Sequence, residues 1–133
     1  VMEKIKIAAI QMSTVADKME NVRTVKAYLE KIKDENPDFV ILPEMFCCPY
    51  QTENFPIYAE KEGGPVWQQL SGYAKQYGIY LIGGSMPEKD AEGNVYNTSY
   101  IFDREGKQIG NIEKYIYLTL MSKAVRHSKN QIR

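Results

Sequence analysis

The stretch Phe39-Val40-Ile41-Leu42-Pro43-Glu44-Met45-Phe46 decides the fold that this chain can adopt. Its leading apolar run predicts a buried strand, and Pro43 ends that strand because proline has no backbone N–H to donate. The carboxylate of Glu44 is therefore expected at the C-terminal end of the strand, where open α/β sheets place their ligands. Glu44 is the first candidate functional residue.

The segment before this stretch predicts a strand and a helix. Residues 5–11 are interpreted as the strand, and Asp17 can cap a helix that continues to about residue 36, where Pro37 stops it. Apolar residues three and four positions apart form one stripe along this helix: Ala16, Met19, Val22, Val25, Leu29 and Ile32. A strand, a helix and a strand with a short return form a βαβ unit, so the strands at residues 5–11 and 39–42 are predicted to be parallel.

A long connection at residues 43–64 leads to a second helix. Connections of this length in compact domains are usually functional or disordered, and the aromatic side chains in this one argue against disorder. Pro65 is expected to begin the second helix and Gly78 to end it. The apolar face of this helix is formed by Val66, Leu70, Tyr73, Ala74 and Tyr77.

The apolar residues 79–82 predict a third strand, which closes with Gly83-Gly84-Ser85. This glycine pair lacks the spacings of a phosphate-binding loop, so packing and turn geometry explain it better. Residues 86–93 are interpreted as a polar turn.

Residues 95–102 predict a fourth strand and residues 108–114 a fifth, joined by a short polar turn. From about Thr119 onward neither a strand nor a helix pattern continues. We therefore expect a domain over residues 1–118 and a basic tail without fixed structure over residues 119–133.

Composition excludes several classes of function. The chain has 133 residues, of which 44% are hydrophobic and 26% charged, as is ordinary for one soluble globular domain. Its 17 basic and 17 acidic residues balance, so no net field recruits nucleic acid or a membrane surface. No signal-peptide segment and no cluster with metal-ligand spacing is present, and we expect a cytoplasmic protein without metal or cofactor.

Five motifs together resemble the N-terminal half of a nitrilase-superfamily carbon–nitrogen hydrolase, over residues 4–118. They are Ile7-Ala8-Ala9-Ile10-Gln11-Met12, Leu42-Pro43-Glu44-Met45-Phe46, Leu81-Ile82-Gly83-Gly84-Ser85-Met86-Pro87-Glu88, Tyr96-Asn97-Thr98-Ser99 and Lys114. The resemblance implies an α/β fold that is half of an αββα sandwich, a mixed sheet with helices on one face. The stretch from Cys48-Pro49-Tyr50 onward is similar to the omega-amidase-like branch, whose members hydrolyse small ω-amides of dicarboxylic acids.

The resemblance also implies roles for particular residues. The family uses a Glu–Lys–Cys triad, in which Glu44 would be the general base and Lys114 would stabilise the oxyanion of the tetrahedral intermediate. Phe46 and Tyr50 either wall a substrate pocket or serve only as core and loop packing. Around Lys114 the chain departs from the family pattern, because a glutamate precedes it and Tyr115-Ile116-Tyr117 follows.

The nucleophile of the family is expected further downstream, and this chain has only the adjacent pair Cys47 and Cys48. We interpret both as reduced structural thiols, since a reactive thiol needs a depressed pKa and a cationic neighbour. The leading hypothesis is therefore an inactive, truncated amidase. The alternatives are a non-catalytic assembly module that pairs with itself or a full-length relative, and an active amidase that uses one of these cysteines.

The predicted strands are apolar on both faces, as in a sheet that is covered on both sides. Two helices can cover only one face. We therefore expect a homo-oligomer that forms through the uncovered face.

Overall fold

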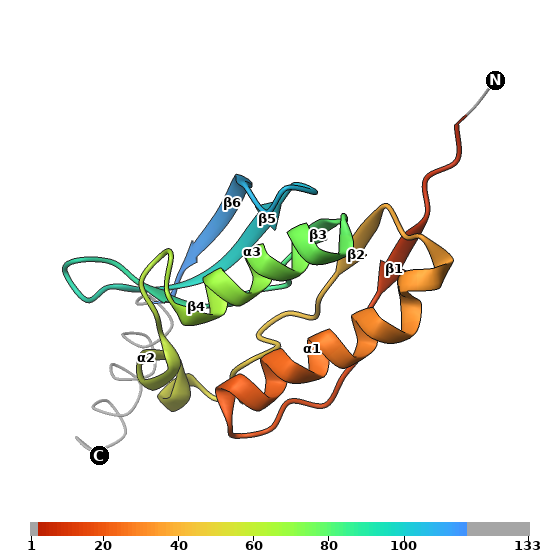
Figure 1. Ribbon diagram of the computed structural model, residues 1–133. Coiled ribbons are helices and arrows are strands. Elements are labelled where there is room, and N and C mark those ends of the chain that lie inside the picture. The colour runs from red at the N-terminus through yellow and green to blue at the C-terminus, as the bar shows by residue number, and fades with distance from the viewer. Residues whose placement is uncertain (1–2, 117–133) are drawn as a thin grey trace, which may run out of the picture.

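The computed structural model describes residues 3–116 as one mixed sheet with helices packed against it (Figure 1). The strands are β1 (Ile7–Ala9), β2 (Phe39–Ile41), β3 (Tyr80–Ile82), β4 (Met86–Lys89), β5 (Val95–Phe102) and β6 (Gln108–Tyr115). The helices are α1 (Lys18–Ile32), α2 (Phe55–Tyr58) and α3 (Pro65–Tyr77), with short 3-10 turns η1 (Lys33–Glu35) and η2 (Thr52–Asn54).

The first half of the sheet is parallel, as the βαβ pattern predicted. β1 pairs with β2 and β2 with β3, in a register that aligns Ile7 with Phe39 and Phe39 with Tyr80. The carboxylate of Asp17 accepts the backbone N–H of Glu20 at 3.1 Å and so caps the start of α1.

The second half of the sheet is antiparallel and is organised around β5. One edge of β5 pairs with β6 along its length. The other edge is shared, because β3 pairs with the end of β5 and β4 pairs with its beginning.

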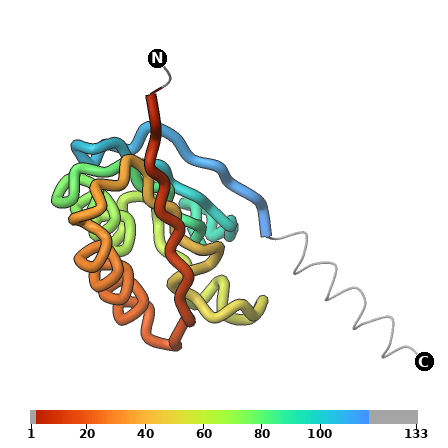
Figure 2. The backbone as a smooth tube through the Cα atoms, turned by 90° about the vertical axis from the view of Figure 1, so that its right-hand side faces the viewer, coloured from red at the N-terminus to blue at the C-terminus, as the bar shows by residue number. Residues whose placement is uncertain are grey.

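Helices α1 and α3 both pack on one face of the sheet, and Figure 2 shows them gathered on one side of the strands. The apolar stripes of both helices meet alternate residues of the strands in a single core. The buried strand residues that contribute to it are Val40, Leu81, Met86, Tyr100 and Phe102. This arrangement confirms the predicted α/β class with helices on one face.

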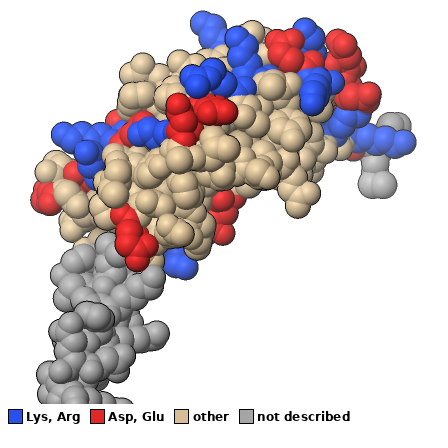
Figure 3. All heavy atoms as spheres, turned by 90° about the horizontal axis from the view of Figure 1, so that it is seen from below, with Lys and Arg blue, Asp and Glu red and all other residues tan. Residues whose placement is uncertain are grey.

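The opposite face of the sheet carries the intervening residues. Ile7 is 61% exposed and Ile112 is 68% exposed, and Ile41 and Ile82 between them are half-exposed. Figure 3 shows many charged side chains of both signs along the upper border and the left end of the view, with a broad uncharged area below the upper border.

One strand lies where the sequence predicted a turn. Residues 86–93 begin with β4, whose Met86 and Glu88 are buried and which pairs with β5 from Met86↔Thr98 to Lys89↔Val95. The sequence did not indicate this strand because the segment contains several charged residues. The hydroxyl of Tyr100 donates to the buried Glu88 carboxylate, so a charged residue occupies a core position.

Two expectations reach beyond this description. The predicted basic tail at residues 119–133 lies outside the described residues. Within residues 3–116, no helix combines the length and the apolar character that crossing a membrane requires.

Candidate functional site

The backbone around Glu44 is held by the segment that follows β3. The hydroxyl of Ser85 accepts the backbone N–H of Met45 at 2.9 Å. Gly84 has a positive φ of 58°, and a Cβ added there would lie 2.0 Å from the carbonyl oxygen of Pro43. Only glycine allows this close approach, so the pair Gly84 and Ser85 fixes where the chain turns at Glu44.

The Glu44 side chain is tied to β5. Its Oε1 atom accepts a hydrogen bond from Nδ2 of Asn97 at 3.0 Å. Asn97 pairs directly with Lys114 across the ladder between β5 and β6. The two predicted catalytic residues thus lie on either side of one asparagine, although Lys114 follows Glu44 by 70 positions along the chain.

Glu44, Asn97 and Lys114 border two adjoining hollows. The main hollow, of about 270 Å³, opens on the uncovered sheet face, and its other lining residues are Ile41, Leu42, Ile82, Gly84, Ser85, Ser99 and Ile112. The side hollow, of about 110 Å³, is more aromatic, and its other lining residues are Met45, Tyr50, Thr52, Phe55, Tyr115 and Ile116. The side chains of an acid, an amide and a lysine therefore border the same space.

The two aromatic residues predicted for the pocket have different positions. Tyr50 lines the side hollow, where its ring meets that of Phe55 edge-to-face at 5.5 Å. Phe46 has no exposed surface and lies in the core between helices and sheet, so it borders neither hollow. The turn after Glu44 sends Met45, Phe46 and the cysteines inward.

Cys47 and Cys48 are buried and line neither hollow. Burial raises the pKa of the Cys47 thiol to about 12 and that of the Cys48 thiol to about 11. At neutral pH both thiols are protonated and weakly nucleophilic.

Sequence reasoning gave no role to two residues that the geometry brings into the site. Asn97 and Ser85 were quoted only as members of motifs. The available signal was a pair of neighbouring polar side chains on one strand face, since Asn97 and Ser99 lie between Val95 and Ile101 on the same face of β5. No group of three His, Cys, Asp or Glu residues within residues 3–116 is placed to hold a metal ion.

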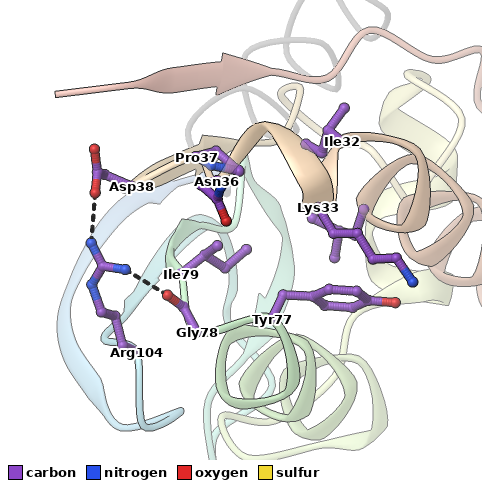
Figure 4. Close-up of a pocket in the computed structure, with 10 residues that line it drawn as sticks. Ile32, Lys33, Asn36, Pro37, Asp38, Tyr77, Gly78, Ile79 and Arg104 are labelled. Carbon is purple, nitrogen blue, oxygen red and sulfur yellow. Dashed lines mark hydrogen bonds and ion pairs between the residues drawn. The ribbon is translucent and has the colours of Figure 1, made fainter.

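A further cavity, of about 170 Å³, lies at the other end of the parallel strands (Figure 4). Its polar groups already bind one another. Arg104 donates to the carbonyl of Gly78 at 2.7 Å and to Asp38 Oδ1 at 2.8 Å. The backbone N–H of Lys6 and the Arg104 guanidinium hold the pKa of Asp38 below its ordinary value. These contacts hold together the N-terminal ends of β1, β2 and β3.

Comparisons with known proteins show the family that this chain resembles in sequence and fold. The sequence profile of carbon-nitrogen hydrolases matches residues 6–129. The chain is 40% identical over 120 residues to omega-amidase NIT3 from Saccharomyces cerevisiae and 39% identical over 113 residues to omega-amidase NIT2 from Homo sapiens. These alignments cover 84% and 85% of this chain but only 41% of each relative.

Solved structures have the same fold. The crystal structure of Saccharomyces cerevisiae Nit3, a member of branch 10 of the nitrilase superfamily, superposes with a TM-score of 0.77 at 36% identity, over 83% of this chain and 44% of that one. An N-terminal amidase at 23% identity has a TM-score of 0.72 and supports the fold alone. The chain therefore spans about two-fifths of the length of the curated relatives that it matches. It belongs to the carbon–nitrogen hydrolase family.

Proposed function

We propose that this chain provides the base and the oxyanion-stabilising cation of an amidase site that acts on small ω-amides. The observation that carries the proposal is the meeting of Glu44, Asn97 and Lys114 around one hollow. The names of the relatives, omega-amidases NIT2 and NIT3, support the substrate class.

In the proposed reaction Glu44 removes the proton from a thiol, and the thiolate sulfur attacks the amide carbon of the substrate. The ammonium of Lys114 stabilises the negative charge that develops on the amide oxygen. The C–N bond then breaks and nitrogen leaves as ammonia with the proton that Glu44 returns. Water hydrolyses the resulting thioester, releases the carboxylic acid and restores the thiol.

The thiol must come from outside residues 1–133, on the same polypeptide or on another. Cys47 and Cys48 are the only cysteines of the printed chain, and both are buried away from the hollows. The 133-residue chain alone is accordingly proposed to be inactive. The two free, adjacent thiols also fit a reducing compartment such as the cytoplasm.

Complementation tests this function. The chain is co-expressed with a polypeptide that corresponds to the remainder of omega-amidase NIT3, and ammonia release from monoamides of short dicarboxylic acids is measured. We expect activity only in the mixture, and we expect Glu44→Gln and Lys114→Met to abolish it. Lys107→Met is the matched control, since Lys107 lies in the turn before β6 and lines neither hollow. Turnover by the chain alone that disappears in Cys48→Ala would overturn the assignment.

The uncovered sheet face supports a second candidate function, a module that pairs with another copy of itself. The exposed side chains Ile7 and Ile112 border this face, and a half-exposed apolar row lies between them. Two copies that pack face to face would remove this surface from water in an interface of the standard size, about 1,600 Å² in total.

The state of association tests this second candidate. Sedimentation at micromolar concentration should show a dimer, and Ile112→Lys should convert it to a monomer because it places a charge in the paired face. Ile57→Lys is the control, since Ile57 is 76% exposed on α2 and lines neither hollow. A wild-type monomer that binds no hydrophobic dye would contradict self-pairing.

A further inference from the structure

Asn97 stands between the two groups that the proposed reaction uses. It lies on β5, and Lys114 is its direct partner on β6. Directly paired residues of an antiparallel ladder point to the same face, with Cβ atoms roughly 4.5–5.5 Å apart. The same Asn97 side chain reaches Glu44 at the end of β2.

The orientation of the Asn97 amide follows from its partner. An ionised carboxylate can only accept hydrogen bonds, so the NH₂ end of the amide must face Glu44. Its Nδ2 atom lies 3.0 Å from Glu44 Oε1. The carbonyl oxygen Oδ1 therefore points to the other side.

That oxygen is the unusual atom of the site. Asn97 Oδ1 is buried and accepts no hydrogen bond from any residue within the described part of the chain. A buried acceptor without a donor is unfavourable, and native structures rarely leave one in that state. The position of Oδ1 thus calls for a donor that reaches it from the hollow.

The Lys114 ammonium is the neighbouring group that meets this requirement. It has three donors and no acceptor, and its flexible stem starts directly opposite Asn97. Both residues line both hollows, so the Lys114 side chain borders the same space as the Asn97 side chain. Ser99 also lines the main hollow, but it lies two residues along the same strand.

We propose that Asn97 is a positioning residue that couples the base to the cation, which rests on the proposed amidase function. Its N–H holds the Glu44 carboxylate, and its Oδ1 accepts a hydrogen bond from the Lys114 ammonium. A neutral amide between them prevents a direct ion pair, which would weaken a carboxylate as a base and neutralise the charge meant for the oxyanion. Glu44 and Lys114 then address the same reacting carbon from fixed positions.

The bland alternative is that Asn97 merely fills space in β5. Asn97→Leu separates the two ideas because it keeps the branched shape of the side chain and removes both the donor and the acceptor without adding a charge. If Asn97 only fills space, Asn97→Leu should behave as the wild type does. If Asn97 couples the pair, Glu44 loses its hydrogen-bond partner.

Nuclear magnetic resonance of the 133-residue chain tests the coupling without any need for activity. The side-chain amide of Asn97 is assigned from its absence in Asn97→Leu. We expect its ¹⁵N shift to change in Glu44→Gln, because that substitution replaces the carboxylate that accepts its N–H. We expect its ¹³Cγ shift, which reports the carbonyl, to change in Lys114→Met but not in Lys107→Met.

Asn111 supplies a matched control on β6. Its Nδ2 donates to Glu113 Oε1 at 2.9 Å, so it is a second asparagine–glutamate pair, away from the hollows. Its amide should ignore both Glu44→Gln and Lys114→Met. Asn97 resonances that respond to neither substitution would overturn the proposal, as would resonances of Asn97 and Asn111 that respond alike.

The complemented enzyme gives a second readout. There Asn97→Leu should lower kcat by about a hundredfold or more with little change in KM, because the lost contact positions reacting groups rather than binding substrate. A hundredfold rise in KM with kcat unchanged would contradict the assigned role. Should the complemented wild type show no amidase activity, the proposed function fails, whereas the coupling of Asn97 is still decided by the resonances.

Discussion

Gly84→Ala should lower the free energy of unfolding of this protein more than the same change at Gly93 or Gly72. Two costs add at this position. Gly84 has a φ of 58°, and a left-handed conformation costs an alanine about 1–2 kcal/mol. The added Cβ would also lie 2.0 Å from the Pro43 carbonyl oxygen and 2.8 Å from the Leu42 carbonyl carbon. Forced overpacking costs about 1–3 kcal/mol, so the sum is about 2–5 kcal/mol.

Two other glycines separate these costs. Gly93 has a φ of 85° with nothing within 4 Å of its added Cβ, so Gly93→Ala carries only the conformational cost of about 1–2 kcal/mol. Gly72 lies within α3 and its added Cβ also meets open space, so Gly72→Ala should stabilise the protein by up to about 1 kcal/mol. The predicted order of stability is Gly72→Ala, wild type, Gly93→Ala, Gly84→Ala.

Urea unfolding followed by tryptophan fluorescence measures this order. Trp67 is the only tryptophan of the chain, and it packs against Phe102 with its Nε1 donating to Gln108 at 2.7 Å. Its emission therefore reports contact between α3 and the sheet. If Gly84→Ala costs no more than Gly93→Ala, the close approach to Pro43 does not constrain the fold, and the account of how Glu44 is positioned fails with it.

Three further predictions concern buried groups. Lys18→Met should lower the free energy of unfolding in urea by about 2–3 kcal/mol, because it removes the ammonium that lies 2.6 Å from the buried Glu60 carboxylate. The control is the exposed pair Lys33 and Glu30, where Lys33→Met should lower it by less than about 1 kcal/mol. Cys47 and Cys48, whose pKa values burial raises to about 12 and about 11, should react with iodoacetamide at pH 8 about a hundredfold more slowly in the folded chain than in urea; rapid labelling of the folded chain would disprove their burial. Burial also raises the pKa of Glu88 above its ordinary value of 4.5, so the folded state holds this proton more tightly, and the resulting stability is full below that pH and lost as pH rises through the raised pKa. Glu88→Gln should flatten this decline in a pH series of unfolding curves, and an unchanged slope would remove Glu88 as its source.

The sheet and its helices were predictable because their signals are local. The stripe along α1 and the apolar runs at β2 and β3 depend on residues a few positions apart. The pairing of Glu44 with Lys114 in one site came from the family resemblance and not from a local pattern. Local patterns could not reveal β4, since its Glu88 is accommodated by a hydroxyl from Tyr100 on a different strand.

The details of the site depend on contacts between distant residues. Asn97 reaches Glu44 across 53 positions of sequence, and no short window contains both. The inward course of Phe46 depends on a turn that Ser85 holds from another segment. These contacts depend on packing and hydrogen bonding between separate elements, so they cannot be predicted from sequence periodicity.

Because β3 and β4 share one edge of β5, the sheet divides into a parallel part, β1 to β3, and an antiparallel part, β4 to β6. The pairs Leu81↔Phe102 and Ile82↔Ile101 join β3 to β5, and the backbone N–H of Gly83 donates to the Tyr100 carbonyl at 2.8 Å immediately beyond. Glu44 belongs to the parallel part, whereas Asn97 and Lys114 belong to the antiparallel part.

The hydrogen bond from Asn97 to Glu44 consequently crosses that junction and holds the two parts together. A twist of one part against the other would open the distance between base and cation without unfolding either part. Amide hydrogen exchange at the β3–β5 pairs would report such opening, and a molecule bound in the main hollow would slow it by holding both parts at once.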